Sequence, residues 1–290
     1  MSENENPERN EKLDHWVSVL SHADLPVLKQ TARELAVLRA DDDRLTTTAV
    51  AEVISRDPIM TVKLLRYLQK HKHRAQTTEV VQVEQALLML GIEPVFKQVP
   101  PEPLAEDILK THLAALPRLL RVVHRSKRAA EYAKEWAVLL HDMHYEEVRI
   151  AALLHDIAEI LMCCFAPDET LEIRNIRHSD LTLRSSFAQE QVLGFNFLEL
   201  QRELAIQWGL PQLLLTLMND ANSNNSRVRN VVLAVNLARH SSHGWDDAAL
   251  PDDYKDIGEL LRMTPDHVKE LIEVVPDDAA DSGKPKSDSN

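Results

Sequence analysis

Glycine, cysteine and long apolar runs are scarce in this sequence, and each scarcity excludes a class of protein. Only 6 of the 290 residues are glycine, against an average of about 7%, which excludes glycine-rich phosphate loops and β-barrels with glycine corners. No run of about 18 apolar residues is present, so no transmembrane helix is expected. The two cysteines, Cys163 and Cys164, are adjacent and would point about 100° apart on a helix. They are therefore expected to be buried, reduced thiols.

Basic residues are in the minority, which bears on the partners that the chain can have. The sequence holds 33 Lys and Arg residues and 46 Asp and Glu residues, a net charge of −13. This negative surplus repels phosphate backbones and anionic lipids, so we expect no nucleic acid and no membrane as partners. The polar N-terminus, MSENENPERNEK, does not resemble a signal peptide, and an apolar content of 44% predicts a globular chain. These features predict a cytoplasmic protein.

Capping and terminating residues in the sequence are those typical of helices. Asp57-Pro58 supplies an N-cap and a first-turn proline ahead of an apolar stripe, and Thr264-Pro265 does the same near the C-terminus. Gly91 and Gly209 stand where two apolar-periodic segments end, the position that favours a glycine after a helix. No sustained alternation of period two is found, so the predicted fold class is all-α.

Proline and amide-rich segments divide the predicted helices into groups. Three prolines in VPPEPL (99–104) cannot continue a helix. They separate a predicted N-terminal helical lobe, 12–99, from a second lobe, 104–220. After the polar segment NDANSNNSR (219–227), a C-terminal helical extension is expected over 226–275. The tails, 1–11 and 276–290, have little apolar content and are predicted to be disordered.

The residues most able to bind a metal or take part in catalysis lie in the second lobe. The segment 148–165, VRIAALLHDIAEILMCCF, is apolar nearly all round and predicts one buried helix, yet it carries His155 and Asp156. A buried carboxylate needs a partner or a metal, because leaving it alone costs several kcal/mol. The segment 119–140 predicts an amphipathic helix that carries His124. An antiparallel pairing of the two helices would bring His124 towards His155 and Asp156.

This arrangement resembles a known superfamily. A helical His followed by AALLHDIAEILM is similar to the HD superfamily of metal-dependent phosphohydrolases. The segments RDPIMTVKLLR, LLMLGIEPV and QEQVLGFNFLELQRELAIQWGLPQLLLTLM narrow the resemblance to the HDOD (HD-related output domain) family of bacterial signalling proteins, over about residues 13–220. The resemblance implies an all-helical fold with an N-terminal lobe and an HD-like lobe, and a role in signal transduction.

The match to an active HD site is incomplete. His124, His155 and Asp156 correspond to its first ligands, but Ala158-Glu159 stands where active relatives have Gly-Lys. Phe197, Asn219 and Asn236 stand where further ligands would lie, and a neutral amide poorly replaces an anionic ligand. Asp220 is the one candidate for an additional carboxylate ligand.

Two interpretations of the cluster follow from these residues. The favoured one is a vestigial, hydrogen-bonded polar cluster with no metal and no cofactor, in a non-catalytic regulatory module that binds a protein partner or a small ligand. The alternative is a residual metal site of His124, His155 and Asp156, in a metal-dependent phosphohydrolase acting on nucleotides or cyclic dinucleotides. The first interpretation predicts no enzymatic activity. A groove between the two lobes is the expected place for a partner.

Overall fold

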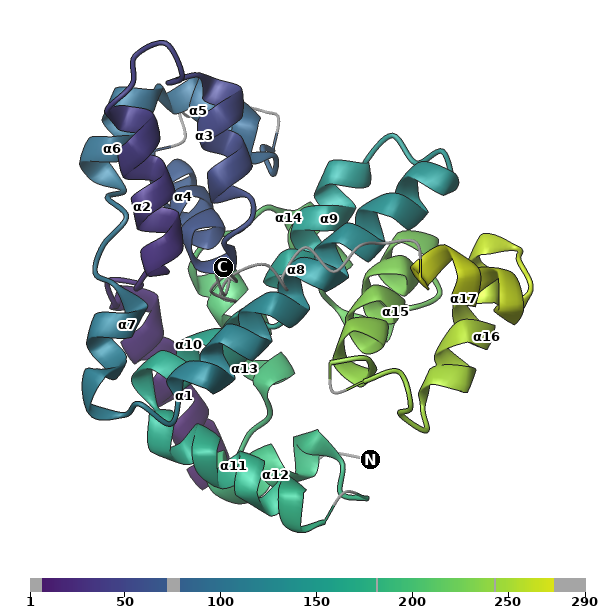
Figure 1. Cartoon of the computed structure of the whole chain (residues 1–290). Helices are drawn as coiled ribbons and strands as arrows, with labels where there is room; N and C mark the ends of the chain where they lie inside the picture. The colour runs from purple at the N-terminus through teal and green to yellow at the C-terminus, as the bar shows by residue number, and fades with distance from the viewer. Residues whose placement is uncertain (1–6, 72–78, 181, 243, 274–290) are drawn as a thin grey trace, which may run out of the picture.

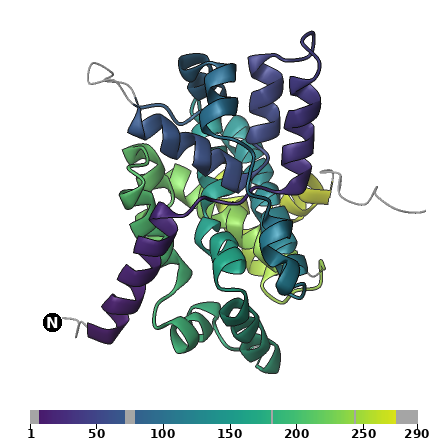
Figure 2. The same cartoon turned by 90° about the vertical axis from the view of Figure 1, so that its left-hand side faces the viewer.

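The computed structural model describes residues 7–71, 79–180, 182–242 and 244–273, and the predicted tail 276–290 lies outside them. Within these ranges the chain forms helices and no β-strand, which confirms the all-α prediction. Residues 7–11, predicted to be part of a disordered tail, instead belong to the first helix, α1 (Pro7–His22). The helix extends this far because it packs against α13 (Phe197–Gln207) of the second lobe, a contact between residues far apart in the sequence. Figure 2 shows α1 pointing away from the other N-terminal helices.

The N-terminal helices that follow α1 form a compact group (Figure 1). Asp57 begins the most buried of them as predicted, because its carboxylate Oδ1 accepts the backbone N–H groups of Ile59 (2.8 Å) and Met60 (3.0 Å). Gly91 separates two short helices with a φ of +81°, a conformation that disfavours residues with a Cβ. The helices of this group are α2 (Lys29–Arg39), α3 (Thr47–Ile54), α4 (Pro58–Lys70), α5 (Val83–Leu90) and α6 (Ile92–Gln98).

The proline segment breaks the helical run where the sequence predicts it. Helix α6 ends at Gln98, and regular structure resumes with α7 (Ala105–Ile108) and the 3₁₀ helix η1 (Leu109–Thr111). The segment is held against the N-terminal group by backbone bonds to Val27, which donates to Pro103 O (2.8 Å) and accepts from Ala105 N (3.0 Å). The break is therefore a fixed corner of the fold.

The long helix α8 (Leu116–Leu139) crosses the middle of the molecule (Figure 1). It packs against α9 (Tyr145–Leu154), α10 (Ile157–Phe165) and α15 (Ser226–His240). The prediction of one helix over 148–165 is wrong, because the helix breaks at His155 and Asp156 into α9 and α10. The break turns both polar side chains out of the helical stripe and towards neighbouring helices. The second lobe continues with α11 (Pro167–Ser179), α12 (Ser185–Leu193), α13, α14 (Gln212–Leu217) and the 3₁₀ helix η2 (Asp220–Asn222).

The last helices complete the same core. Helix α15 lies along α8 and α9, and it buries Val231, Ala234 and Leu237. Helix α16 (Leu250–Leu261) packs on its outer side, and α17 (Pro265–Glu273) packs on α16 (Figure 1). The segment expected as a C-terminal extension thus supplies one wall of the core around α8.

The described helices are too short or too polar to cross a membrane singly. The one combination that passes by length and composition, Tyr145–Phe165 with Pro167–Ser179, is bent by 114° at its joint.

Candidate functional site

A buried ionic cluster occupies the junction of α8, α10, η2 and α15. Its carboxylates come from the α9–α10 break, from the first turn of α10 and from η2. Its cations come mainly from α8 and α15. The ionic cluster is made of Arg118, Arg125, His155, Asp156, Glu159, Asp220 and Arg239.

Helix geometry places the two arginines of α8 on one side. Arg118 and Arg125 are seven positions apart on α8, which is close to two full turns, so their side chains leave the same face. Glu159 follows Asp156 by three positions and lies one turn away on α10. Facing helices therefore present two guanidinium groups to two carboxylates.

Arg125 is the centre of the cluster. Its Nε lies 2.8 Å from Asp156 Oδ2, its Nη2 lies 2.5 Å from the same oxygen, and Nη2 also lies 2.7 Å from Glu159 Oε2. The second oxygen of Glu159 accepts from Arg118 Nη2 at 2.9 Å. The side chain of Arg125 is only 13% exposed, so both carboxylates meet a permanent cation in a place that water scarcely reaches.

His155 joins the cluster to η2. Its Nε2 lies 2.8 Å from Asp220 Oδ1. Its Nδ1 lies 3.6 Å from Asp156 Oδ1, which is too long for a hydrogen bond, and this nitrogen is buried without a hydrogen-bond partner among the described residues. The contact between Nδ1 and Asp156 is thus one of charge rather than of hydrogen bonding.

Arg239, in the last turn of α15, completes the cluster. Its Nη2 lies 3.4 Å from Asp156 Oδ1. Asn236, which stands one turn earlier where an active HD site would have its last Asp, is half-buried. The helix that would supply an anionic ligand therefore supplies a cation.

Throughout the cluster, pairing with opposite charges shifts the pKa values of the buried groups in the direction opposite to burial, and pairing has the larger net effect. Burial by itself would lower the pKa of His155, but the hydrogen bond to Asp220 and the charges of Asp156 and Asp220 raise it to about 9. Burial opposes ionisation of Asp156 and Glu159 as well. The guanidinium of Arg125 nevertheless holds the pKa of Asp156 well below its usual range and lowers that of Glu159. At neutral pH the cluster is a network of imidazolium, guanidinium and carboxylate ions.

The structure changes the expected membership of the site. It brings His155, Asp156 and Asp220 together, but His124 is exposed on α8 and its neighbour Arg125 lies against Asp156 instead. Sequence reasoning missed all three arginines. The spacing of Arg118 and Arg125 was a signal for two of them, because it predicts a common helix face opposite the His-Asp pair.

The residues do not fit a metal ion of the HD type. Such a site needs imidazole nitrogens and carboxylates that are free to bind a metal, whereas here His155 Nε2 is hydrogen bonded to Asp220 and Asp156 is bound by Arg125. In the part of the chain that the structure describes, no group of three or more His, Cys, Asp or Glu side chains is arranged to hold a metal. A cation supplied by the protein takes up the negative charge that a metal would otherwise balance.

Comparison with known proteins identifies the class to which this all-helical fold belongs. It is similar to the solved MmoQ response regulator of Methylococcus capsulatus str. Bath, with a TM-score of 0.63 and 19% identity over 87% of this chain and 99% of that one. It is also similar to a solved virulence factor of Campylobacter jejuni subsp. jejuni, with a TM-score of 0.61 and 18% identity over 90% of this chain and 92% of that one. No curated protein matches the chain.

The family follows from the sequence itself. The HDOD domain matches the chain over residues 25–223. The chain belongs to the HDOD family, as the resemblance of its HD-like and upstream segments implied.

Proposed function

We propose that this protein is a non-catalytic regulatory module of signal transduction that acts by binding another protein. The observation that supports this proposal is the position of Arg125, whose guanidinium bridges Asp156 and Glu159. In an HD hydrolase the Asp of this pair would bind a metal. Here it is bound by an arginine, a side chain that is not deprotonated in proteins.

The ionic cluster is better suited to hold helices together than to catalyse. A divalent ion would have to displace Arg125 from Asp156 and separate His155 from Asp220. The displaced guanidinium would then be left near the incoming charge. We therefore do not favour the phosphohydrolase alternative, and we assign no reaction to these residues.

Family membership supports the regulatory half of the proposal. The MmoQ protein, which has a similar fold, bears the name of a response regulator. Members of one fold share architecture more readily than activity, so the partner of this chain is proposed only as a protein of a signalling system.

Metal analysis tests the non-catalytic half. The protein is purified without chelator, its metal content is measured by mass spectrometry, and Mn²⁺ is titrated by calorimetry. We expect a metal content near zero, no saturable Mn²⁺ binding, and no hydrolysis of nucleotides or cyclic dinucleotides in added Mn²⁺. About one tightly bound metal per chain, or turnover that is lost in Asp156→Asn, would contradict the proposal.

A variant pair makes the metal test specific to Arg125. Removing the guanidinium in Arg125→Gln frees Asp156 and Glu159, so this variant should bind Mn²⁺ more tightly than the parent protein does. Arg121→Gln, one turn away on α8 and exposed, is the matched control and should behave as the parent. Equal Mn²⁺ affinity in all three proteins would show that Arg125 does not decide metal binding.

Association is tested separately with the intact chain. Size-exclusion chromatography of a native lysate, followed by mass spectrometry of the fractions, should place the protein in a complex larger than 33.0 kDa that contains a second signalling protein. Elution as a free chain under all growth conditions would count against the regulatory role.

A further inference from the structure

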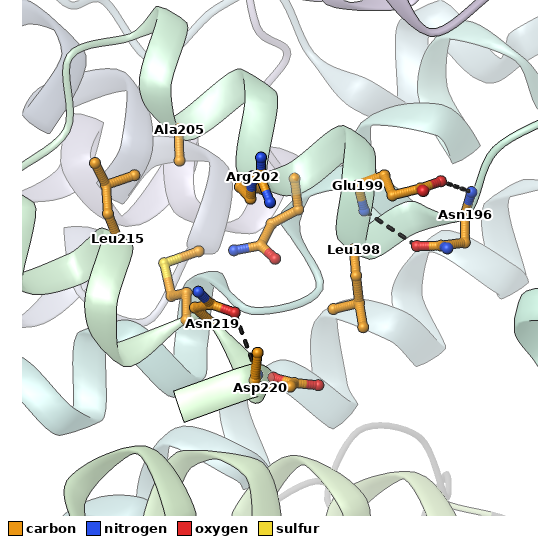
Figure 3. A pocket seen from close by; sticks show the side chains of 11 residues that line it. Asn196, Leu198, Glu199, Arg202, Ala205, Leu215, Asn219 and Asp220 are labelled. Carbon is orange, nitrogen blue, oxygen red and sulfur yellow. Dashed lines mark hydrogen bonds between the residues drawn. The ribbon is translucent and has the colours of Figure 1, made fainter. Parts of the chain in front are cut away.

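A pocket lies beside the ionic cluster, between α13, α14 and η2. Its volume is about 270 Å³, room for roughly nine water molecules at ~30 Å³ each. Leu198 and Leu215 lie on opposite sides of it, and Asp220 lies at one edge (Figure 3). No part of the ionic cluster other than Asp220 lines this pocket.

Gln201 supplies the first sign that the pocket accepts a ligand. The residue is 2% exposed and lines the pocket, yet its side-chain amide has no hydrogen-bond partner among the described residues. A buried amide without a partner is costly, so such groups are nearly always satisfied by another molecule. The amide of Gln201 offers a donor and an acceptor to whatever occupies the pocket.

Asp220 supplies the second sign. Its Oδ1 is used by His155 at 2.8 Å, whereas its Oδ2 makes no hydrogen bond within the described part of the chain. The side chain is 38% exposed. A carboxylate fixed on one oxygen and open on the other is a directed acceptor for a charged donor.

The remaining lining defines the shape and charge of the ligand. Leu198, Leu215 and Met218 present apolar surface, as is usual in small-molecule sites with a few convergent polar groups. The charged residues of the lining are Glu199, Arg202 and Asp220. Glu199 pairs with Arg9 and Arg202 pairs with Glu203, which leaves the second oxygen of Asp220 as the charged group that is open to a ligand. The pocket therefore favours a cationic head over an anionic one.

We propose that this pocket binds a small molecule with a flat apolar body and a cationic amidine or amine head. The head pairs with Asp220 Oδ2, the body lies between Leu198 and Leu215, and the amide of Gln201 hydrogen bonds the polar edge of the ligand. This inference goes beyond the regulatory role proposed above and does not depend on it, because the binding can be measured without any partner or reaction.

Three probes of the same shape test the head group. Benzamidine, benzamide and benzoate share a flat ring and differ in carrying a cationic, a neutral and an anionic head. Titrations of the full chain followed by protein NMR or saturation-transfer NMR should rank benzamidine first, benzamide at least about fivefold weaker, and benzoate last. Equal affinities, or no binding by any probe, would overturn the proposal and leave the pocket as a site for water alone.

Variants locate the binding within the pocket. Gln201→Leu should weaken benzamidine binding at least about fivefold and leave the melting temperature unchanged or higher, since the amide bonds no protein group. Asp220→Asn should abolish the preference for benzamidine over benzamide. Gln207→Leu, the same change at an exposed position of the same helix outside the lining, is the matched control and should bind as the parent does.

The Gln201→Leu variant keeps the test decisive even if Asp220→Asn fails to fold, because Asp220 also contacts His155. Undiminished benzamidine binding in Gln201→Leu would place the ligand elsewhere and refute the assignment.

Discussion

Replacing Arg125 by methionine tests the ionic cluster most directly. The substitution keeps an unbranched side chain but removes the cation shared by Asp156 and Glu159. Breaking a buried ion pair by removing one partner costs about 3–5 kcal/mol, because the other charge stays buried and unpaired. Here Asp156 keeps Arg239, and Glu159 keeps Arg118. We therefore expect the lower end, a loss of ~3 kcal/mol in the free energy of unfolding.

The loss is measured by urea denaturation followed by far-ultraviolet circular dichroism at pH 7.5. At roughly 2–4 °C per kcal/mol for a chain of about this size, the melting temperature should fall by about 6–12 °C. Arg121→Met is the control, because Arg121 is exposed on the same helix and surface changes usually stay within about 0.5 kcal/mol. A loss below ~1 kcal/mol for Arg125→Met, or an equal loss for both variants, would refute the reasoning.

A double substitution separates pairing from simple loss of packing. Asp156→Asn alone should destabilise, since it leaves Arg125 with one carboxylate partner fewer. Combined with Arg125→Met, it should cost clearly less than the sum of the single losses, because neither charge is then left alone. Strict additivity would mean that Arg125 acts through its aliphatic stem only.

Three further predictions concern other buried groups. First, the pKa of His155 is raised from 6.5 to about 9, so its contribution to stability is complete below pH 6.5. That contribution, on the order of a few kcal/mol, is lost as the pH rises through 9, which urea denaturation from pH 6 to pH 10 will detect. Second, Asp57→Ala should cost at least about 2 kcal/mol in the same assay, because Asp57 caps α4 and also accepts the Thr31 hydroxyl at 2.7 Å. Third, burial raises the pKa of the Cys163 thiol to about 12, so a thiol reagent at pH 8 should leave the native protein unmodified and react after unfolding in guanidinium.

Each of these predictions has an outcome that opposes it. The alkaline loss of stability should vanish in His155→Gln, and a loss that persists there would assign it to another group. Full stability in Asp57→Ala would mean that the capping bonds contribute nothing net. Rapid labelling of Cys163 or Cys164 in the native protein would show that α10 opens readily.

Local features of the sequence were sufficient to predict the class of the fold and several helix boundaries. Asp57-Pro58 begins α4, and Gly91 separates α5 from α6. Pro100 and Pro103 lie in the break before α7. These signals work because capping and proline geometry depend on neighbours within a few positions of the chain.

The helix break at His155 and Asp156 could not be read in this way. Segment 148–165 is apolar enough for one continuous helix, and no proline or glycine interrupts it. The break is stabilised by partners from elsewhere, since Arg125 binds Asp156 and Asp220 binds His155. A local pattern contains no information about such partners.

The sequence by itself determined that the chain is helical, that its thiols are buried, and that it resembles the HDOD family. Only the tertiary structure decided which ions meet Asp156. Arg239 is 83 positions away from it along the chain, and Asp220 is 65 positions away from His155. The physical reason is that a buried charge needs an opposite charge beside it, and only the folded core brings distant residues close enough to supply one. The packing of α8, α10 and α15, rather than any motif, therefore placed a guanidinium against Asp156.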